Sequence, residues 1–120
     1  MSTQNTIRRQ FTDRGREEEL RELMHRRILV LDGAMGTMLQ AAELTAADFG
    51  GEALEGCNEN LVLTRPDVIR GVHEKYFAAG ADMVETNTFG SVRHVLAEYD
   101  LQDKAREINR IACILAREAA

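Results

Sequence analysis

Two short segments of the sequence place a carboxylate beside an apolar run. Asp32 and the glycine-rich residues 33–37 follow the apolar residues 28–31, and Glu85 lies in the run that begins at Met83. Residues 28–31 are apolar at every position, as expected for a strand that is covered on both faces of a parallel sheet. The carboxyl ends of parallel strands share one edge, where α/β folds bind ligands. The sequence therefore predicts that Asp32 and Glu85 lie in one binding site.

The composition argues against several classes of function. The 120 residues are 44% hydrophobic and 29% charged, which is typical of a globular domain. The net charge is -5, only 5% of the residues are aromatic and there is no basic stripe, so we expect no binding to nucleic acid. No apolar run approaches the roughly 18 residues of a membrane span, and no secretory signal is present. Cys57 and Cys113 are expected to be free thiols of a cytoplasmic protein without membrane association.

Hydrophobic spacing predicts alternating helices and strands after a polar start. Residues 1–15 are expected to form a disordered or loosely held N-terminal arm. The expected elements are a helix over 16–27, a strand over 28–31, a short helix within 36–44, a helix over 64–79, a strand over 83–86, and helices over 91–99 and 103–115. Thr64 and Ser91 are expected to cap helices, and Gly80 is expected to end one in the left-handed conformation.

This order of elements is that of an unfinished domain. Two parallel strands would leave open edges and could not cover the apolar faces of the predicted helices. An eight-stranded barrel takes about 250 residues. We therefore predict an α/β fold in which residues 16–120 are the opening βα units of a (β/α)8 TIM barrel, incomplete in this chain.

Three passages resemble the homocysteine S-methyltransferase family. They are RILVLDGAMGTMLQ at 27–40, CNENLVLTRPDVIRGVHEKYFAAGADMVETNTFGS at 57–91, and EINRIACILARE at 107–118. The resemblance covers roughly residues 18–120 and is to the N-terminal homocysteine-binding domain of cobalamin-dependent methionine synthases. Betaine-dependent and other homocysteine S-methyltransferases share this type of domain.

The resemblance implies a barrel that binds homocysteine, ionises its thiol on zinc and accepts a methyl group from methylcobalamin. Later folate and cobalamin domains would supply that methyl group. The zinc ligands of the family are three cysteines on late strands, two of them adjacent, and neither Cys57 nor Cys113 matches them. Zinc and cobalamin are therefore expected in the full-length family enzyme. This fragment is expected to bind neither and to be inactive without the rest of the barrel.

The resemblance also assigns substrate-binding roles at the first predicted strand end. Asp32 matches a family aspartate that faces the amino-acid end of homocysteine, where its carboxylate would accept a hydrogen bond from the ammonium group. The alternative is that Asp32 caps the turn into residues 33–36. Gly33 and Ala34 would allow backbone N–H groups to approach the substrate carboxylate, or they would simply form a tight turn.

Glu85, Thr86 and Asn87 correspond to the ETNTF segment of the family. Thr86 matches a substrate-contacting position. Glu85 would serve the ammonium group or an internal hydrogen bond of the barrel. Asn87, like Thr88, suits either ligand contact or fixation of its own loop. The predicted substrate-binding residues are thus Asp32, Gly33, Ala34, Glu85, Thr86 and Asn87, and no catalytic or metal-binding residue is predicted.

The methionines and histidines near these segments have simpler interpretations. Met35 and Met38 could line a pocket for a thioether-like ligand, although methionine more often fills a core. His25, His73 and His94 are expected on the surface and not as metal ligands.

Three functional hypotheses follow. The first is the N-terminal part of a methionine synthase, and the second is a cobalamin-independent homocysteine S-methyltransferase of the same family. The third is a non-catalytic truncated module that uses an open sheet edge to pair with a partner. The methyl donor cannot be read from this chain, because its determinants would lie in later domains.

Overall fold

The computed structural model describes residues 14–120. Most of the predicted N-terminal arm, residues 1–13, lies outside the described part, and residues 14 and 15 already belong to the first described helix. Within the described residues, no helix combines the length and the apolar character needed to cross a membrane.

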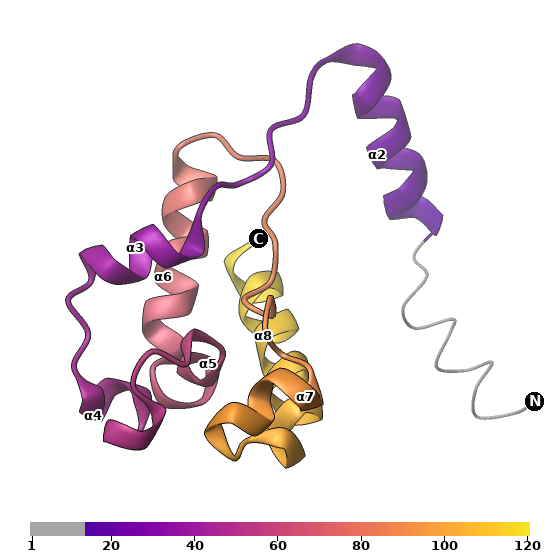
Figure 1. The fold of residues 1–120 in the computed structure, drawn as a ribbon. Coiled ribbons are helices and arrows are strands. Elements are labelled where there is room, and N and C mark those ends of the chain that lie inside the picture. The colour runs from indigo at the N-terminus through magenta and orange to yellow at the C-terminus, as the bar shows by residue number, and fades with distance from the viewer. Residues whose placement is uncertain (1–13) are drawn as a thin grey trace, which may run out of the picture.

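The described chain is a set of helices joined by loops (Figure 1). In chain order the elements are α2 (Arg14–Arg26), α3 (Met35–Ala41), α4 (Ala46–Phe49), η1 (Glu52–Leu54), η2 (Asn58–Asn60), α5 (Leu61–Thr64), α6 (Pro66–Ala78), α7 (Arg93–Leu96), η3 (Ala97–Tyr99), η4 (Gln102–Lys104) and α8 (Ala105–Ala119), where η marks a 3-10 helix. The predicted helices over 16–27 and within 36–44 correspond to α2 and α3.

The predicted α/β fold is wrong for the described residues. Residues 28–31 and 83–86 run side by side in the same direction, but they are joined by a single parallel bridge between Leu31 and Met83. Neither segment is a strand, and no sheet forms among residues 14–120. The described chain therefore does not contain the βα units of a TIM barrel.

The physical reason is that nothing described covers the apolar run. Ile28 is 89% exposed, Val30 53% and Leu31 49%. A strand that is apolar on both faces is stable in a sheet whose faces carry helices, and two strands alone are marginal in water. The composition of residues 28–31 is that of a buried strand, but the described residues do not supply the neighbours that would bury it.

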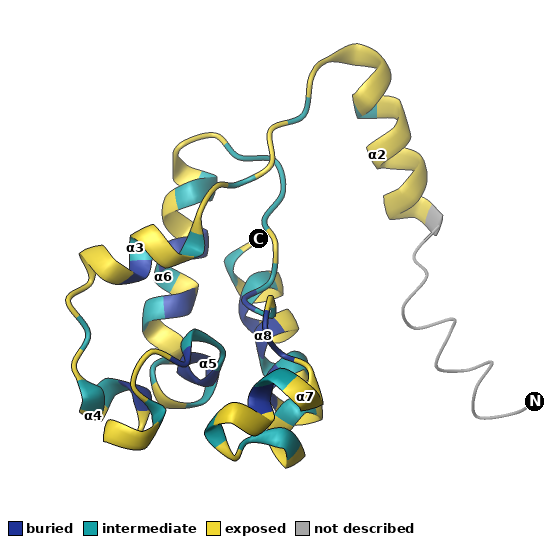
Figure 2. Ribbon diagram, in the orientation of Figure 1, coloured by how far each residue is buried: buried dark blue, intermediate teal, exposed yellow. Residues whose placement is uncertain are grey.

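The core lies instead between helices. The fully buried side chains of Leu61 on α5, Ile69 on α6 and Ile108 on α8 meet there, and each contributes roughly 1.5–3 kcal/mol by leaving water. Figure 2 shows the buried positions on the facing sides of these helices. The buried apolar residues are Leu39, Phe49, Cys57, Leu61, Val62, Ile69, Val72, Leu96, Ile108, Ala112 and Leu115.

Helix α6 ends as predicted but begins differently. Gly80 has a φ of 108°, which confirms the left-handed stop after the helix. Thr64, however, is the last residue of α5, and its hydroxyl donates to the carbonyl of Asn60 at 3.4 Å. Arg65 occupies the cap position without a capping side chain, and Pro66 takes the first turn, where its missing N–H costs nothing.

The two later helices begin one or two residues later than predicted. Val92, not Ser91, precedes α7, and the buried hydroxyl of Ser91 has no hydrogen-bond partner among the described residues. Asp103 lies in η4, and α8 starts at Ala105. The helix predicted over 91–99 is the four-residue α7 followed by the 3-10 helix η3, and the helix predicted over 103–115 is η4 followed by α8.

Asp82 fastens the two segments next to the bridge. Its carboxylate accepts hydrogen bonds from Nη1 and Nη2 of Arg27, at 2.9 and 2.7 Å, and from the N–H of Val30 at 2.8 Å. The hydrogen bond from Arg27, followed by that from Val30, lowers the pKa of Asp82 to about 2. The N–H of Asp82 in turn donates to the carbonyl of Val30 at 2.8 Å. The side-chain and backbone hydrogen bonds of Asp82 thus join the two segments in place of the repeated backbone hydrogen bonds of a sheet.

Acid should therefore open this contact at an unusually low pH. A carboxyl whose pKa is lowered by folding contributes stability above its ordinary value of 3.8 and loses it as the pH falls toward about 2. We expect the Val30 amide resonance to titrate with a midpoint of about 2, and this step to vanish in Asp82→Asn. Asp103→Asn, which alters an exposed aspartate far from the contact, is the control. A Val30 midpoint near 4 would contradict this account.

Candidate functional site

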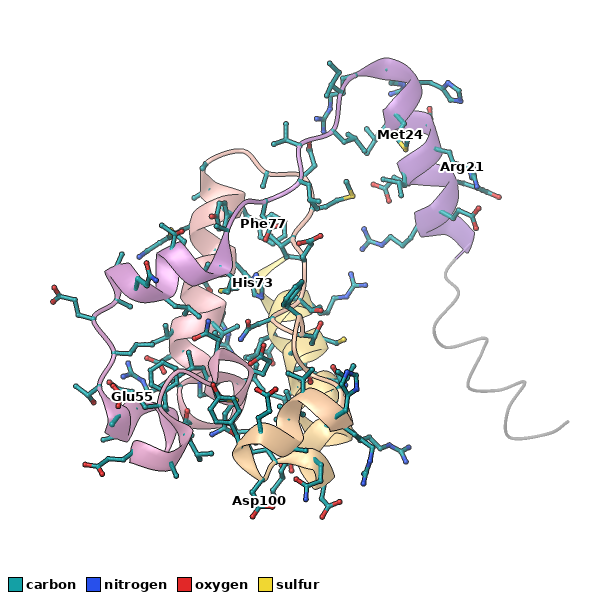
Figure 3. All side chains as sticks on the ribbon, viewed as in Figure 1. Arg21, Met24, Glu55, His73, Phe77 and Asp100 are labelled. Atoms are coloured by element: carbon teal, nitrogen blue, oxygen red, sulfur yellow. The ribbon has the colours of Figure 1, made fainter. Side chains whose placement is uncertain are left out.

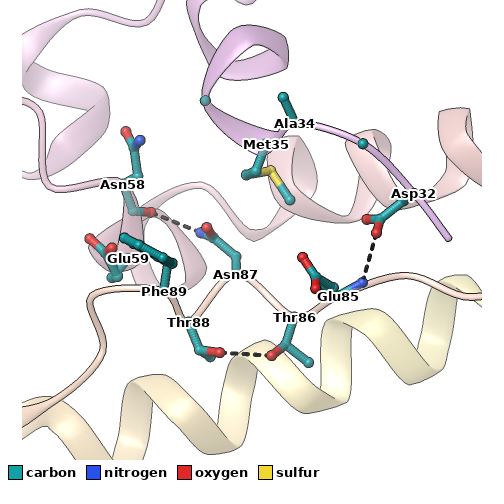
Figure 4. A pocket seen from close by; sticks show the side chains of 12 residues that line it. Asp32, Ala34, Met35, Asn58, Glu59, Glu85, Thr86, Asn87, Thr88 and Phe89 are labelled. Atoms are coloured by element: carbon teal, nitrogen blue, oxygen red, sulfur yellow. Dashed lines mark hydrogen bonds between the residues drawn. The ribbon is translucent and has the colours of Figure 1, made fainter.

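A pocket of about 470 Å³ lies between the start of α3, η2 and the loop after the bridge (Figure 4). All the residues predicted to bind substrate line it, namely Asp32, Gly33, Ala34, Glu85, Thr86 and Asn87. The other lining residues are Met35, Gly36, Asn58, Glu59, Thr88 and Phe89. The structure thus brings the two predicted segments together even though they form no sheet, and it adds a wall from η2.

Asp32 links the two segments through its backbone and its side chain. Its N–H donates to the carbonyl of Met83 at 3.0 Å, and its Oδ1 accepts the N–H of Glu85 at 3.1 Å. It does not cap α3, whose cap residue is Ala34 without a side-chain hydrogen bond. Its Oδ2 accepts no hydrogen bond from residues 14–120. One half of this carboxylate is therefore available to a cationic group in the pocket.

Gly33 and Ala34 pass close over Tyr76 of α6. The Tyr76 hydroxyl donates to the carbonyl of Ala34 at 2.7 Å, and a Cβ on Gly33 would lie 3.1 Å from that hydroxyl oxygen. The N–H groups of Gly33 and Ala34 donate to no acceptor within the described part of the chain. The absence of a side chain at Gly33 thus permits the close approach and leaves two backbone donors at the pocket.

The opposite wall is a loop held by its own side chains. The hydroxyls of Thr86 and Thr88 share a hydrogen bond at 2.8 Å, and Nδ2 of the buried Asn87 donates to the carbonyl of Asn58 at 2.9 Å. The loop-fixing role that we considered for Asn87 is thus present in its contacts. The exposed side chain of Glu85 accepts no hydrogen bond from the described residues, so its carboxylate is free.

Sequence reasoning missed four residues of this region. Asn58 and Glu59 belong to a polar group in a long glycine-rich connection, and that unusual length was the available signal. Tyr76 lies in the helix predicted over 64–79, and no contact with the site was expected of it. Phe89 lines the pocket and is 104% exposed. Its apolar side chain gave no indication in the sequence that it would be exposed at a site.

The pocket is negatively charged. Three of its lining residues carry carboxylates, Asp32, Glu59 and Glu85, and none of its lining residues is Lys or Arg. Because opposite charges attract more strongly at a partly buried site than in water, this lining favours a ligand with a positive group.

Zinc does not fit the residues that the structure describes. Among residues 14–120, no group of three or more His, Cys, Asp or Glu side chains could hold a metal ion. Cys57 is buried, and its burial raises the pKa of its thiol, whereas Cys113 is exposed on α8. Both cysteines are free thiols, and neither belongs to such a group in the described part of the chain.

The structure tests whether Met35 and Met38 line the pocket or fill the core, and whether the three histidines lie on the surface. Met35 lines the pocket, whereas Met38 packs against the core. His25 and His94 are exposed, as predicted. The surface prediction for His73 is wrong: Figure 3 shows it within the helical body, its side chain is fully buried, and neither ring nitrogen has a partner among the described residues. Burial lowers the pKa of His73, and nearby Asp32 partly opposes that shift.

Comparison with known proteins agrees with the resemblance seen in the sequence. The family model for homocysteine S-methyltransferase matches residues 29–120. The chain belongs to the homocysteine S-methyltransferase family. The whole pocket of this family member, from Asp32 to Phe89, lies inside the matched range.

Two curated relatives of this homocysteine S-methyltransferase chain are methionine synthases. The methionine synthase of Mycobacterium leprae is 52% identical over 104 residues, which cover 87% of this chain and 8% of that protein. The methionine synthase of Mycobacterium tuberculosis is 50% identical over 104 residues, covering 87% of this chain and 9% of that protein. The chain thus spans less than a tenth of the length of these relatives.

The close approach of Gly33 to Tyr76 should be sensitive to one methyl group. Gly33→Ala would push the Tyr76 hydroxyl away from Ala34 and should cost up to about 1 kcal/mol, the typical net value of one hydrogen bond. Gly36→Ala is the matched control, because a Cβ there meets nothing within 4 Å and alanine favours α3 by about 0.5–1 kcal/mol. Urea unfolding followed by circular dichroism compares them, and equal effects of the two substitutions would contradict the assigned contact.

Proposed function

We propose that this pocket binds the amino-acid end of homocysteine in a homocysteine S-methyltransferase. The observation that carries the proposal is the free Oδ2 of Asp32 beside the free N–H groups of Gly33 and Ala34. A carboxylate oxygen suits the ammonium group of an amino acid, and backbone N–H groups suit its carboxylate. Membership of the family supports homocysteine over other amino acids.

The second wall of the pocket has a supporting role in this proposal. The free carboxylate of Glu85 is a second acceptor for the ammonium group, because its side chain has no partner among the described residues. The hydroxyl of Thr86 contacts the substrate, and Asn87 holds its loop on Asn58 while its carboxamide faces the pocket. Asp32 remains the main determinant, since it is anchored on one oxygen and open on the other.

The rest of the reaction belongs to other parts of a longer protein in this proposal. Zinc would ionise the homocysteine thiol and cobalamin would carry the methyl group, but residues 14–120 have no ligand set for a metal. We therefore assign no step of methyl transfer to this chain. The names of both relatives favour methionine synthase over a cobalamin-independent methyltransferase, and the later part of such a protein would cover the exposed residues 28–31.

A chimera tests the proposal in a complete enzyme. The matching segment of the Mycobacterium leprae methionine synthase is replaced by that of this chain, and the KM for homocysteine is measured. Asp32→Asn keeps an oxygen for the Glu85 N–H but removes the charge. We expect it to raise the KM about ten-fold to a hundred-fold, because a hydrogen bond to a charged group is worth about 1.5–3 kcal/mol. Thr86→Val should cost about 1 kcal/mol, or roughly five-fold.

Asp103→Asn is the matched control for the chimera. It removes an equal charge from a side chain that is 85% exposed and lies outside the pocket. The KM should stay at the unsubstituted value. If Asp32→Asn instead lowers the melting temperature sharply and leaves the KM unchanged, Asp32 is a structural link and the proposed function is wrong.

The metal prediction concerns the 120-residue chain by itself. Since its described residues offer no ligand set, the purified chain should retain no stoichiometric zinc after mild chelation and should transfer no methyl group to homocysteine. Elemental analysis after dialysis against a weak chelator measures the metal content. One tightly held zinc ion per chain would refute the expectation.

A further inference from the structure

Glu59 differs from the other two carboxylates of the pocket because the protein already occupies both its oxygens. Its Oε1 accepts the N–H of Gly90 at 2.9 Å, and the thiol of Cys57 donates to its Oε2 at 3.8 Å. Asp32 keeps one free oxygen, and Glu85 keeps two. Figure 4 shows Glu59 at the pocket wall formed by η2, next to Phe89. Its carboxylate is therefore poorly suited to bind a ligand and well suited to hold the loop.

The end of the loop formed by residues 86–90 packs directly against the Glu59 side chain. Gly90 is buried, and a Cβ there would lie 2.7 Å from Oε1 of Glu59 and 3.2 Å from Cγ1 of Val95. A Cβ at 2.7 Å does not fit without displacement of the carboxylate. Glycine at position 90 thus permits a short, charge-assisted bond between η2 and the end of the loop.

Two neighbouring contacts stabilise this arrangement. Nδ2 of Asn87 donates to the carbonyl of Asn58 at 2.9 Å, which ties the middle of the loop to the same helix. Burial raises the pKa of the Cys57 thiol, so the sulfur keeps its proton and remains a donor to Glu59. Residues 86–90 are thereby attached to η2 at two points, and one of them depends on Glu59.

We propose that Glu59 is a positioning residue that fixes residues 86–90 and so places Thr86 in the homocysteine site. The identity of the ligand rests on the proposed function. The placement of the loop does not, because it follows from contacts within the chain. Glu59 acts through Gly90 and touches no substrate.

Amide exchange tests the positioning step without any ligand. In Glu59→Ala the Gly90 N–H loses its acceptor, and we expect its hydrogen exchange in the 120-residue chain to become about tenfold faster. Glu59→Gln keeps an acceptor oxygen and should exchange at nearly the original rate. Glu55→Ala is the matched control, since this exposed glutamate makes no side-chain hydrogen bond among the described residues. Unchanged Gly90 exchange in Glu59→Ala would overturn the proposal.

Kinetics of the chimera test whether the attachment of the loop by Glu59 affects homocysteine binding. Glu59→Ala should raise the KM for homocysteine about fivefold, as Thr86→Val does, because both remove the Thr86 contact. Glu59→Gln should restore the KM, which separates positioning from direct binding of the ammonium group. In the double variant, Thr86→Val should add little to Glu59→Ala, whereas a role in stability alone predicts no effect on KM.

The outcomes separate the two proposals. If Glu59→Ala accelerates Gly90 exchange but leaves the KM unchanged while Asp32→Asn raises it, the positioning role is overturned and the proposed function stands. If neither Asp32→Asn nor Thr86→Val changes the KM, the proposed function fails, whereas the Gly90 exchange result still supports attachment of the loop by Glu59. A Glu59→Gln variant as impaired as Glu59→Ala would overturn positioning in favour of direct ligand contact.

Discussion

Carboxylate side chains that bind backbone N–H groups hold the two halves of the site together. Asp82 accepts the N–H of Val30, and Asp32 accepts that of Glu85, on either side of the Leu31–Met83 bridge. Hydrogen bonds to ionised acceptors are stronger than those between neutral groups, so a few of them can fix a register that a single bridge leaves weak. Without these contacts the glycine-rich residues 33–36 and the loop after residue 85 would not be held together around one pocket.

The three carboxylates of the pocket have different tasks, which their contacts define. Glu59 is engaged on both oxygens, Asp32 on one and Glu85 on neither. A side chain that is anchored at one oxygen loses less conformational freedom when the other binds a ligand, which lowers the cost of ordering. The three carboxylates thus differ in how many of their oxygens are already hydrogen-bonded. This difference explains why Asp32 is the best suited of the three to recognise a ligand.

The candidate site could be predicted better than the fold. The residues at Asp32 and Glu85 were identified because a carboxylate directly follows or interrupts an apolar run, and that local pattern does not depend on a sheet. Helix α6 followed from the spacing of its apolar residues and from Gly80. The strands failed because covering residues 28–31 requires neighbours that the described chain lacks, and the burial of His73 depends on long-range packing. The contacts of Glu59 with Cys57 and Gly90 likewise depend on loop geometry that spacing does not encode.

The central claim is that the free oxygen of Asp32 recognises the ammonium group of an amino acid. Its most direct test removes that group from the ligand instead of the charge from the protein. In the methionine synthase chimera, the dissociation constants of homocysteine and of its deaminated analogue, 4-mercaptobutyrate, are compared by calorimetry. We predict that the chimera prefers homocysteine about tenfold or more and that Asp32→Asn abolishes most of this preference. Equal affinity for both ligands, or a preference that survives Asp32→Asn, would contradict the account.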